Sequence, residues 1–171
     1  MLTPDMKAVI DAASLCFCAT VTPDGRPNLS PKGTIRVWDD TRLFFLDIAS
    51  PQTRANIAHS PWAELNVVDL LSRRGYRFFG HAEVHAAGSD TYNEGLRRVF
   101  GDATPTYPVE TVVVVTIQRA GPLLSPAYWR SADELEIREH WRPRREKLDR
   151  EFDAHIARVG PTRVESRGQR S

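Results

Sequence analysis

The sequence predicts a small antiparallel β-barrel with helical additions, and three observations support this fold class. Six or so short segments rich in apolar and β-branched residues are separated by turns that contain proline, glycine and aspartate. Long helices do not alternate with these segments, as a parallel α/β sheet would require. The 171 residues are enough for one domain with a core of its own. Closing the strands into a barrel, either complete or split, would remove their exposed edges.

The chain opens with a predicted helix over Thr3–Ala13, in which Thr3 is the N-cap and Pro4 takes the first helical position. Three strands are expected next: Leu15–Thr22, then Asn28–Trp38, which is interrupted by Pro31 and Gly33, and Arg42–Ile48. Because the loops between them are short, we expect these strands to form an antiparallel meander.

A second helix is predicted over Ser50–His59, with Ser50 as its N-cap and Pro51 at its first position. Later elements are the strands Trp62–Val68, Tyr76–His85 and Thr111–Gln118, the helix Ser89–Phe100, and a segment Pro122–Trp129 that extends or follows the last strand. Two final helices, Ala132–Trp141 and Pro143–Val159, are expected to be divided at the proline, which breaks helix interiors.

Composition shifts near residue 130, where charged residues become crowded. We therefore expect a barrel over residues 1–130, a helical extension of the same domain over 131–159, and a flexible tail over 160–171. The net charge of +1 argues against a nucleic-acid-binding protein. The sequence shows no apolar run near the roughly 20 residues of a membrane helix and no signal-peptide pattern. A soluble cytoplasmic protein is expected.

Residues that could bind a ligand gather on the predicted strand Asn28–Trp38. Side chains alternate along a strand, which places two hydroxyls and two cations on one face: Ser30, Lys32, Thr34 and Arg36. Gly33 permits a flat ligand to approach the backbone closely. The alternative is a solvated edge strand, which would also carry polar side chains.

The start of the helix Ser50–His59 is a second candidate. Ser50, Thr53 and Arg54 place hydroxyls and a cation at a helix N-terminus, where free N–H groups favour anions such as phosphate. Arg36 could converge on the same anion. An ordinary capped helix is the alternative.

Four segments, in this order and spacing, resemble the pyridoxamine 5′-phosphate oxidase-like flavoproteins: Thr20–Arg36, Leu43–Ile57, Gly75–Val84 and Leu124–Tyr128. The similarity covers about residues 8–140. It implies a mainly β fold, an antiparallel Greek-key split barrel that forms a homodimer and binds FMN between the subunits.

The resemblance also implies roles for individual residues. Those expected to line the isoalloxazine ring are Ser30, Lys32, Gly33 and Thr34. Those expected around the ribityl phosphate are Arg36, Ser50, Thr53, Arg54 and Asn56. Lys32 is the candidate to polarise the N1/C2 carbonyl side of the flavin.

The expected activity is hydride transfer through the flavin, with a nicotinamide or another small molecule as donor. Charged helices over Ala132–Val159 replace the arginine-containing final strand of authentic pyridoxamine phosphate oxidases, so we expect a different substrate. Two alternatives are a deazaflavin-dependent reductase on the same barrel and a flavin- or haem-binding module without turnover.

The cysteines and the aromatic pair near residue 130 complete the candidates. Cys16 and Cys18 share one strand face without further ligands at metal-site spacing, so we expect buried cysteines and no metal site. Tyr128 and Trp129 either stack on a flat cofactor of a partner chain or form a hydrophobic plug against the C-terminal helices.

Overall fold

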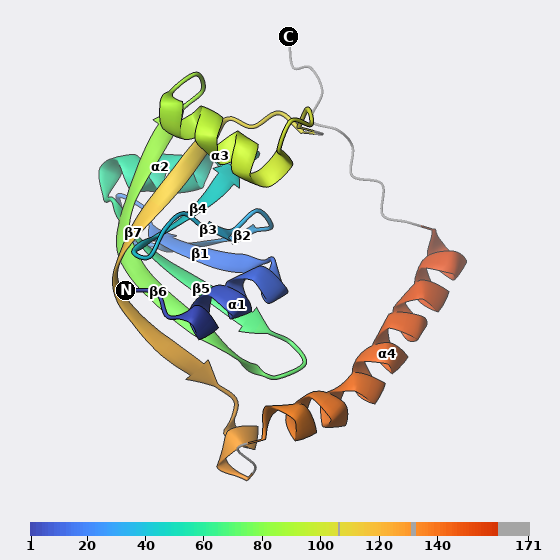
Figure 1. Ribbon diagram of the computed structural model, residues 1–171. Coiled ribbons are helices and arrows are strands. Elements are labelled where there is room, and N and C mark those ends of the chain that lie inside the picture. The colour runs from blue at the N-terminus through green and yellow to red at the C-terminus, as the bar shows by residue number, and fades with distance from the viewer. Residues whose placement is uncertain (106, 131–132, 161–171) are drawn as a thin grey trace.

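The computed structural model describes residues 1–105, 107–130 and 133–160. In these residues, seven strands form one antiparallel sheet that curls around a buried interior (Figure 1). The strands are β1 (Cys16–Val21), β2 (Pro27–Lys32), β3 (Arg36–Val37), β4 (Arg42–Asp47), β5 (Trp62–Asp69), β6 (Arg74–Ala86) and β7 (Thr111–Leu124). They follow the order β2-β1-β5-β6-β7-β4-β3 across the sheet. The predicted antiparallel barrel with helical additions is confirmed.

The helices of the described residues are α1 (Pro4–Ala13), α2 (Pro51–His59), α3 (Asp90–Phe100), the 3₁₀ helix η1 (Pro126–Trp129) and α4 (Glu134–Val159). Local signals explain their starts. The Thr3 hydroxyl accepts a hydrogen bond from the Met6 N–H, and the Ser89 hydroxyl accepts one from the Tyr92 N–H. The predicted cap of α1 is therefore confirmed, and Ser89 is the cap of α3.

Strands β4 and β7 are covered on both faces, which explains their unbroken apolar runs. Phe45 points into the barrel interior, where α1 contributes Ile10. The neighbouring Phe44 belongs to a second cluster, which α3 covers with Leu96 and Phe100. Alternate faces of the same strand thus fill two separate apolar layers.

The predicted strand Asn28–Trp38 is interrupted at Gly33, as expected, and the chain leaves the sheet between β2 and β3. Pro31, the other expected interruption, lies within β2. β2 pairs with β1, whereas β3 pairs with β4, and the two hairpins lie at opposite ends of the strand order. The predicted meander is present only as two separate hairpins, because the break between β2 and β3 leaves no single middle strand to join them. The later strands β5 and β7 pair with β1 and β4 and so connect the two hairpins through the rest of the sheet.

The predicted division at Pro143 is wrong, because α4 runs through it as one helix. Proline removes one hydrogen bond to the carbonyl four residues earlier, that of Glu139. Glu139 is exposed, so water can satisfy that carbonyl.

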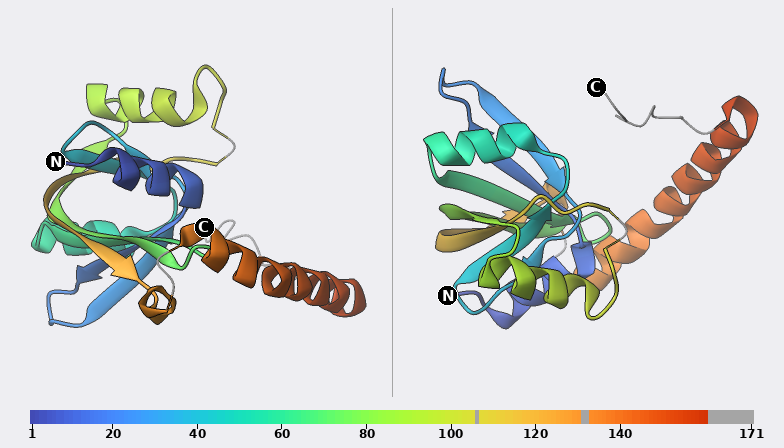
Figure 2. Two further views of the ribbon diagram at one scale, coloured as in Figure 1. Left: turned by 60° about the horizontal axis from the view of Figure 1, so that its bottom comes forward. Right: turned by 90° about the horizontal axis from the view of Figure 1, so that it is seen from above.

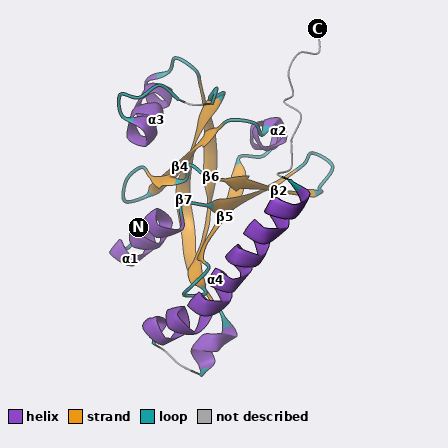
Figure 3. Ribbon diagram, turned by 90° about the vertical axis from the view of Figure 1, so that its right-hand side faces the viewer, coloured by secondary structure: helices purple, strands orange, loops and turns teal. Residues whose placement is uncertain are grey.

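α4 projects away from the barrel (Figure 2), and Figure 3 shows it as one long helical ribbon. Its one buried residue is Ile137. Arg74 on β6 holds the base of the helix by pairing with Glu134 and with Asp5 of α1. None of the described helices has the length and apolar character needed to cross a membrane. The predicted tail lies, apart from Gly160, outside the described residues.

Candidate functional site

A pocket of about 530 Å³ opens where β2 ends, beside the loop from β4 to α2. It brings together five of the residues singled out in the sequence: Ser30, Lys32, Gly33, Thr34 and Ser50. Seven further residues line the pocket and were not predicted: Pro31, Leu46, Asp47, Ile48, Ala49, Phe100 and Tyr107. Phe100 and Tyr107 come from the end of α3 and the chain after it, so no nearby sequence pattern links them to the pocket.

Lys32 is the buried cation of this pocket, with 4% of its side chain exposed. Its Nζ donates hydrogen bonds to the hydroxyls of Ser30, at 2.9 Å, and of Ser50. Nζ also lies 5.3 Å from the ring centre of Phe45 and 4.0 Å from Oδ1 of Asp47. Burial lowers the pKa of Lys32, and the Asp47 carboxylate opposes that shift. Of the predicted polar face, Ser30 and Lys32 do share one side of β2.

Asp47 is the last residue of β4, and its side chain is 1% exposed. Oδ1 accepts hydrogen bonds from the backbone N–H of Ser50, at 3.1 Å, and from the Ser50 hydroxyl. Oδ2 accepts a bond of 2.7 Å from Nη1 of Arg54. The sequence signal for Asp47 was an aspartate that ends an apolar run three residues before the N-cap position of α2, where such side chains organise turns.

Ser50 does not cap α2 through its side chain, which corrects the sequence prediction. Its hydroxyl is already committed to Lys32 and Asp47. Pro51 at the start of the helix lacks an N–H, so one donor that would need a cap is absent.

Gly33 and Thr34 carry the chain from β2 toward β3 along the pocket wall. The Thr34 hydroxyl donates to the Leu46 carbonyl, at 3.2 Å, and accepts from the Leu46 N–H, at 2.9 Å. This hydroxyl replaces the strand pairing that the break removes. A Cβ on Gly33 would meet no atom within 4 Å, so the backbone there faces open space.

Four predicted site residues lie outside the pocket lining. Asn56 is fully buried and donates to the Thr20 hydroxyl, at 2.9 Å. Thr53 is also buried, and its hydroxyl has no partner among the described residues. Arg54 pairs with Asp47, and Arg36 donates to the carbonyl of Ile35, at 2.7 Å.

The donor set fits a flat, anionic cofactor such as FMN. Hydroxyl and ammonium groups can donate to flavin carbonyl oxygens, and guanidinium groups pair well with phosphate. The unpartnered Thr53 hydroxyl, in the first turn of α2, is a further donor without a protein acceptor. The pocket volume falls within the range of about 300–1,000 Å³ typical of small-molecule sites.

Cys16 and Cys18 are buried on the inner face of β1, as expected. Burial raises the pKa of their thiols, to about 12 and about 11 respectively. Within the described ranges, no three His, Cys, Asp or Glu side chains gather in a way that could hold a metal ion.

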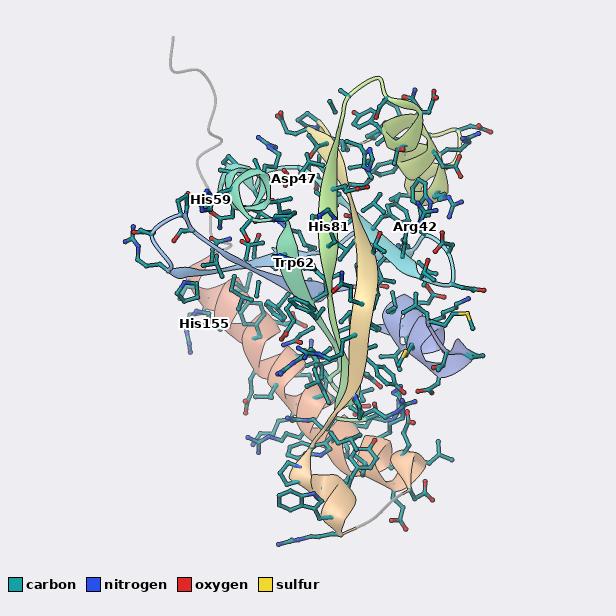
Figure 4. All side chains as sticks on the ribbon, turned by 90° about the vertical axis from the view of Figure 1, so that its left-hand side faces the viewer. Arg42, Asp47, His59, Trp62, His81 and His155 are labelled. Atoms are coloured by element: carbon teal, nitrogen blue, oxygen red, sulfur yellow. The ribbon has the colours of Figure 1, made fainter. Side chains whose placement is uncertain are left out.

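Two aromatic features lie away from the pocket. Trp62 and His81 meet edge to face on an accessible part of the sheet (Figure 4). The Tyr128 hydroxyl donates to the Ser72 carbonyl, at 2.8 Å, whereas the Trp129 side chain is 87% exposed.

The family model for pyridoxamine 5′-phosphate oxidase matches residues 2–123. The solved structure of tagged HupZ from Group A Streptococcus is 32% identical, with a TM-score of 0.64, over 73% of this chain and 96% of that chain. A candidate pyridoxamine 5′-phosphate oxidase from Lactobacillus delbrueckii is 28% identical, with a TM-score of 0.60, over 70% of this chain and 93% of that one.

More distant similarities show the fold alone. An FMN-binding protein from Syntrophomonas wolfei is 17% identical, with a TM-score of 0.58, over 71% of this chain and 85% of that chain. An F420 reductase, at 21% identity, and the heme storage protein HutZ from Vibrio cholerae, at 18%, have TM-scores of 0.55 and 0.56. A search of curated proteins finds no match. The expected split barrel is confirmed by these structures.

Proposed function

We propose that this chain, which belongs to the pyridoxamine 5′-phosphate oxidase family, binds FMN in the pocket beside β2 and acts as an oxidoreductase. The observation that carries the proposal is the buried Lys32 ammonium, held by two hydroxyls at the pocket wall. Burying a cation is costly unless it has partners, and here the cation borders a space large enough for a ligand.

Individual residues have distinct roles in this proposal. Lys32 donates to the carbonyl side of the flavin ring, where its charge stabilises negative charge that develops on reduction. The open backbone at Gly33 lets the flat ring lie close to the chain. Arg36, Arg54 and the first turn of α2 bind the phosphate. Bound flavin supplies hydride transfer.

The proposal includes a homodimer with the cofactor between subunits and a nicotinamide or small organic molecule as donor. Large apolar side chains on β1 and β2 support a covered surface, since Phe17, Val21 and Leu29 are all exposed. Isolated apolar residues are common on protein surfaces, but a group on two adjacent strands is typical of an interface.

The first experiment is the absorption spectrum of freshly purified protein, followed by mass analysis of what denaturation releases. Flavin bands and released FMN would support the proposal. Release of a deazaflavin would instead favour a deazaflavin-dependent reductase, and release of haem would favour a haem-binding module. A colourless protein that also fails to bind added FMN would contradict the proposal. Multiple turnovers with NAD(P)H and an acceptor would separate an enzyme from a binding module.

The phosphate assignment is tested with the double variant Arg36→Ala/Arg54→Ala. Charged hydrogen bonds contribute about 1.5–3 kcal/mol each, so losing two should raise the Kd for FMN by about 100-fold or more. Arg145→Ala, on the exposed face of α4, is the matched control. Unchanged FMN binding by the double variant would exclude both arginines from the phosphate site.

A further inference from the structure

Three charged side chains form a connected group at the pocket: Lys32, Asp47 and Arg54. The two carboxylate oxygens of Asp47 face different cations. Oδ1 lies 4.0 Å from Lys32 Nζ and is joined to it through the Ser50 hydroxyl, whereas Oδ2 contacts Arg54 directly, at 2.7 Å. One buried carboxylate therefore connects the strand that carries Lys32 with the helix that carries Arg54.

The charge on Lys32 depends on this carboxylate. The other titratable or charged groups that face Lys32 are Cys16 and Cys18 from β1 and Arg54 from α2. Both cysteines are buried and remain neutral thiols at neutral pH, because their pKa values are raised. Arg54 repels the ammonium. Among the described groups facing Lys32, Asp47 is therefore the one carboxylate that favours the charged form of the lysine.

We propose that Asp47 is the positioning residue of the pocket, which keeps Lys32 a cation and holds Arg54 in place for an anionic ligand. Two cations and one carboxylate leave the group with a net charge of +1. The pocket thus keeps an uncompensated positive charge that an anion such as a phosphate or a reduced flavin can neutralise. The identity of this ligand as FMN rests on the proposed function, whereas the role of Asp47 toward Lys32 does not.

The test uses Asp47→Asn, which keeps the shape of the side chain and removes its charge. The chain has three lysines, Lys7, Lys32 and Lys147, so ¹³C-lysine labelling gives three resolvable Cε signals in the FMN-free protein. An opposite charge at this distance shifts a titration by about 1–3 pH units. We expect the Lys32 midpoint to fall by that amount in Asp47→Asn.

Asp40→Asn is the matched control, because Asp40 is an exposed carboxylate that pairs with Lys7. It should leave the Lys32 midpoint unchanged. Ser50→Ala provides a second variant, since it keeps the Asp47 charge but removes the hydroxyl between it and Lys32. We expect a smaller fall in the Lys32 midpoint, and this variant decides the question if Asp47→Asn does not fold.

The second readout is FMN binding at a pH between the wild-type and Asp47→Asn midpoints, where only the wild-type Lys32 is charged. The Kd should rise at least tenfold in Asp47→Asn. An unchanged Lys32 midpoint in the folded variants would overturn the inference, as would equal or tighter FMN binding by Asp47→Asn at that pH. If the midpoint falls but wild-type protein binds no FMN, the role of Asp47 stands and the proposed function fails.

Discussion

The pocket and helix α4 use the same kinds of charged residue under opposite conditions. In the pocket, Lys32 and Asp47 are almost fully buried. On α4, Arg145 and Asp149 form an ion pair of 3.0 Å in which each side chain is 53% exposed. A buried charge loses its water and needs nearby partners, whereas an exposed pair contributes about 0–1 kcal/mol at most.

This difference separates residues that organise the site from residues that keep a helix solvated. The pocket charges sit above an apolar interior, with the Phe45 ring directly beneath Lys32. The far part of α4 has no such support, because Ile137 near its start is its one buried residue among those described. The effects of substitutions on the free energy of unfolding should therefore differ in size between the two regions. Four predictions test this difference.

The largest effect is expected for Phe45→Ala, which removes a fully buried ring from the barrel core. Lost burial and the remaining cavity should lower the free energy of unfolding by about 3–5 kcal/mol. Phe152→Ala on α4 is the matched control, since that ring is exposed, and it should change stability by less than about 0.5 kcal/mol. Urea unfolding measures both values. Equal effects would contradict the difference between the two regions.

The next effect is a gain in stability from Thr53→Val in the FMN-free protein. The Thr53 hydroxyl is buried without a partner among the described residues, and an unsatisfied buried group costs about 1–3 kcal/mol. Valine keeps the shape of the threonine side chain and has a similar helix propensity. The free energy of unfolding should therefore rise by about 1 kcal/mol or more. Thr53→Ser, which keeps the hydroxyl, should show no gain. A loss of stability in Thr53→Val would mean that the hydroxyl has a partner.

A smaller, pH-dependent effect is expected at Asp5, where α1 meets the base of α4. Hydrogen bonds from Arg74 and then Tyr76 lower the pKa of Asp5 from 3.8 to about 2. Because the pKa of Asp5 is lower in the folded protein, its carboxylate stabilises the fold at pH values above its unfolded-state pKa, which is near 4. This contribution is lost as the pH falls toward 2.

Asp5→Asn should therefore lower the free energy of unfolding at pH 7 by about 1 kcal/mol, a figure reduced for the solvent exposure of the pair. Thermal or urea unfolding at several pH values measures it. The difference from wild type should disappear near pH 2. A difference that persists at that pH would show that packing, rather than charge, is responsible.

The smallest effect on overall stability is expected for Pro143→Ala in α4. Restoring the missing hydrogen bond should favour the helix locally, yet global unfolding should change by less than about 0.5 kcal/mol, because this part of α4 packs little against the barrel. Slower amide hydrogen exchange over residues 144–159, with unchanged exchange in β4 and β7, is the expected result. A large gain in global stability would show that α4 and the barrel unfold together.

Several elements follow from local signals between neighbouring residues of the sequence. The N-caps at Thr3 and Ser89, the alternation that buries Cys16 and Cys18, and the approximate strand positions all depend on neighbouring residues. Two parts of the candidate site, the β2–β3 segment and the β4–α2 loop, were also visible because hydroxyls and cations gather there.

Tertiary structure alone decided which strands pair, how the pocket charges connect and which distant residues line the pocket. β1 and β4 keep their local hairpin partners and gain second partners from later in the chain, β5 and β7, which no local sequence signal specifies. Asp47 acquires its role only when folding brings Lys32 and Arg54 to its two oxygens. Burial then raises the free-energy cost of each charge. The order of residues along the chain does not show which of these side chains become buried.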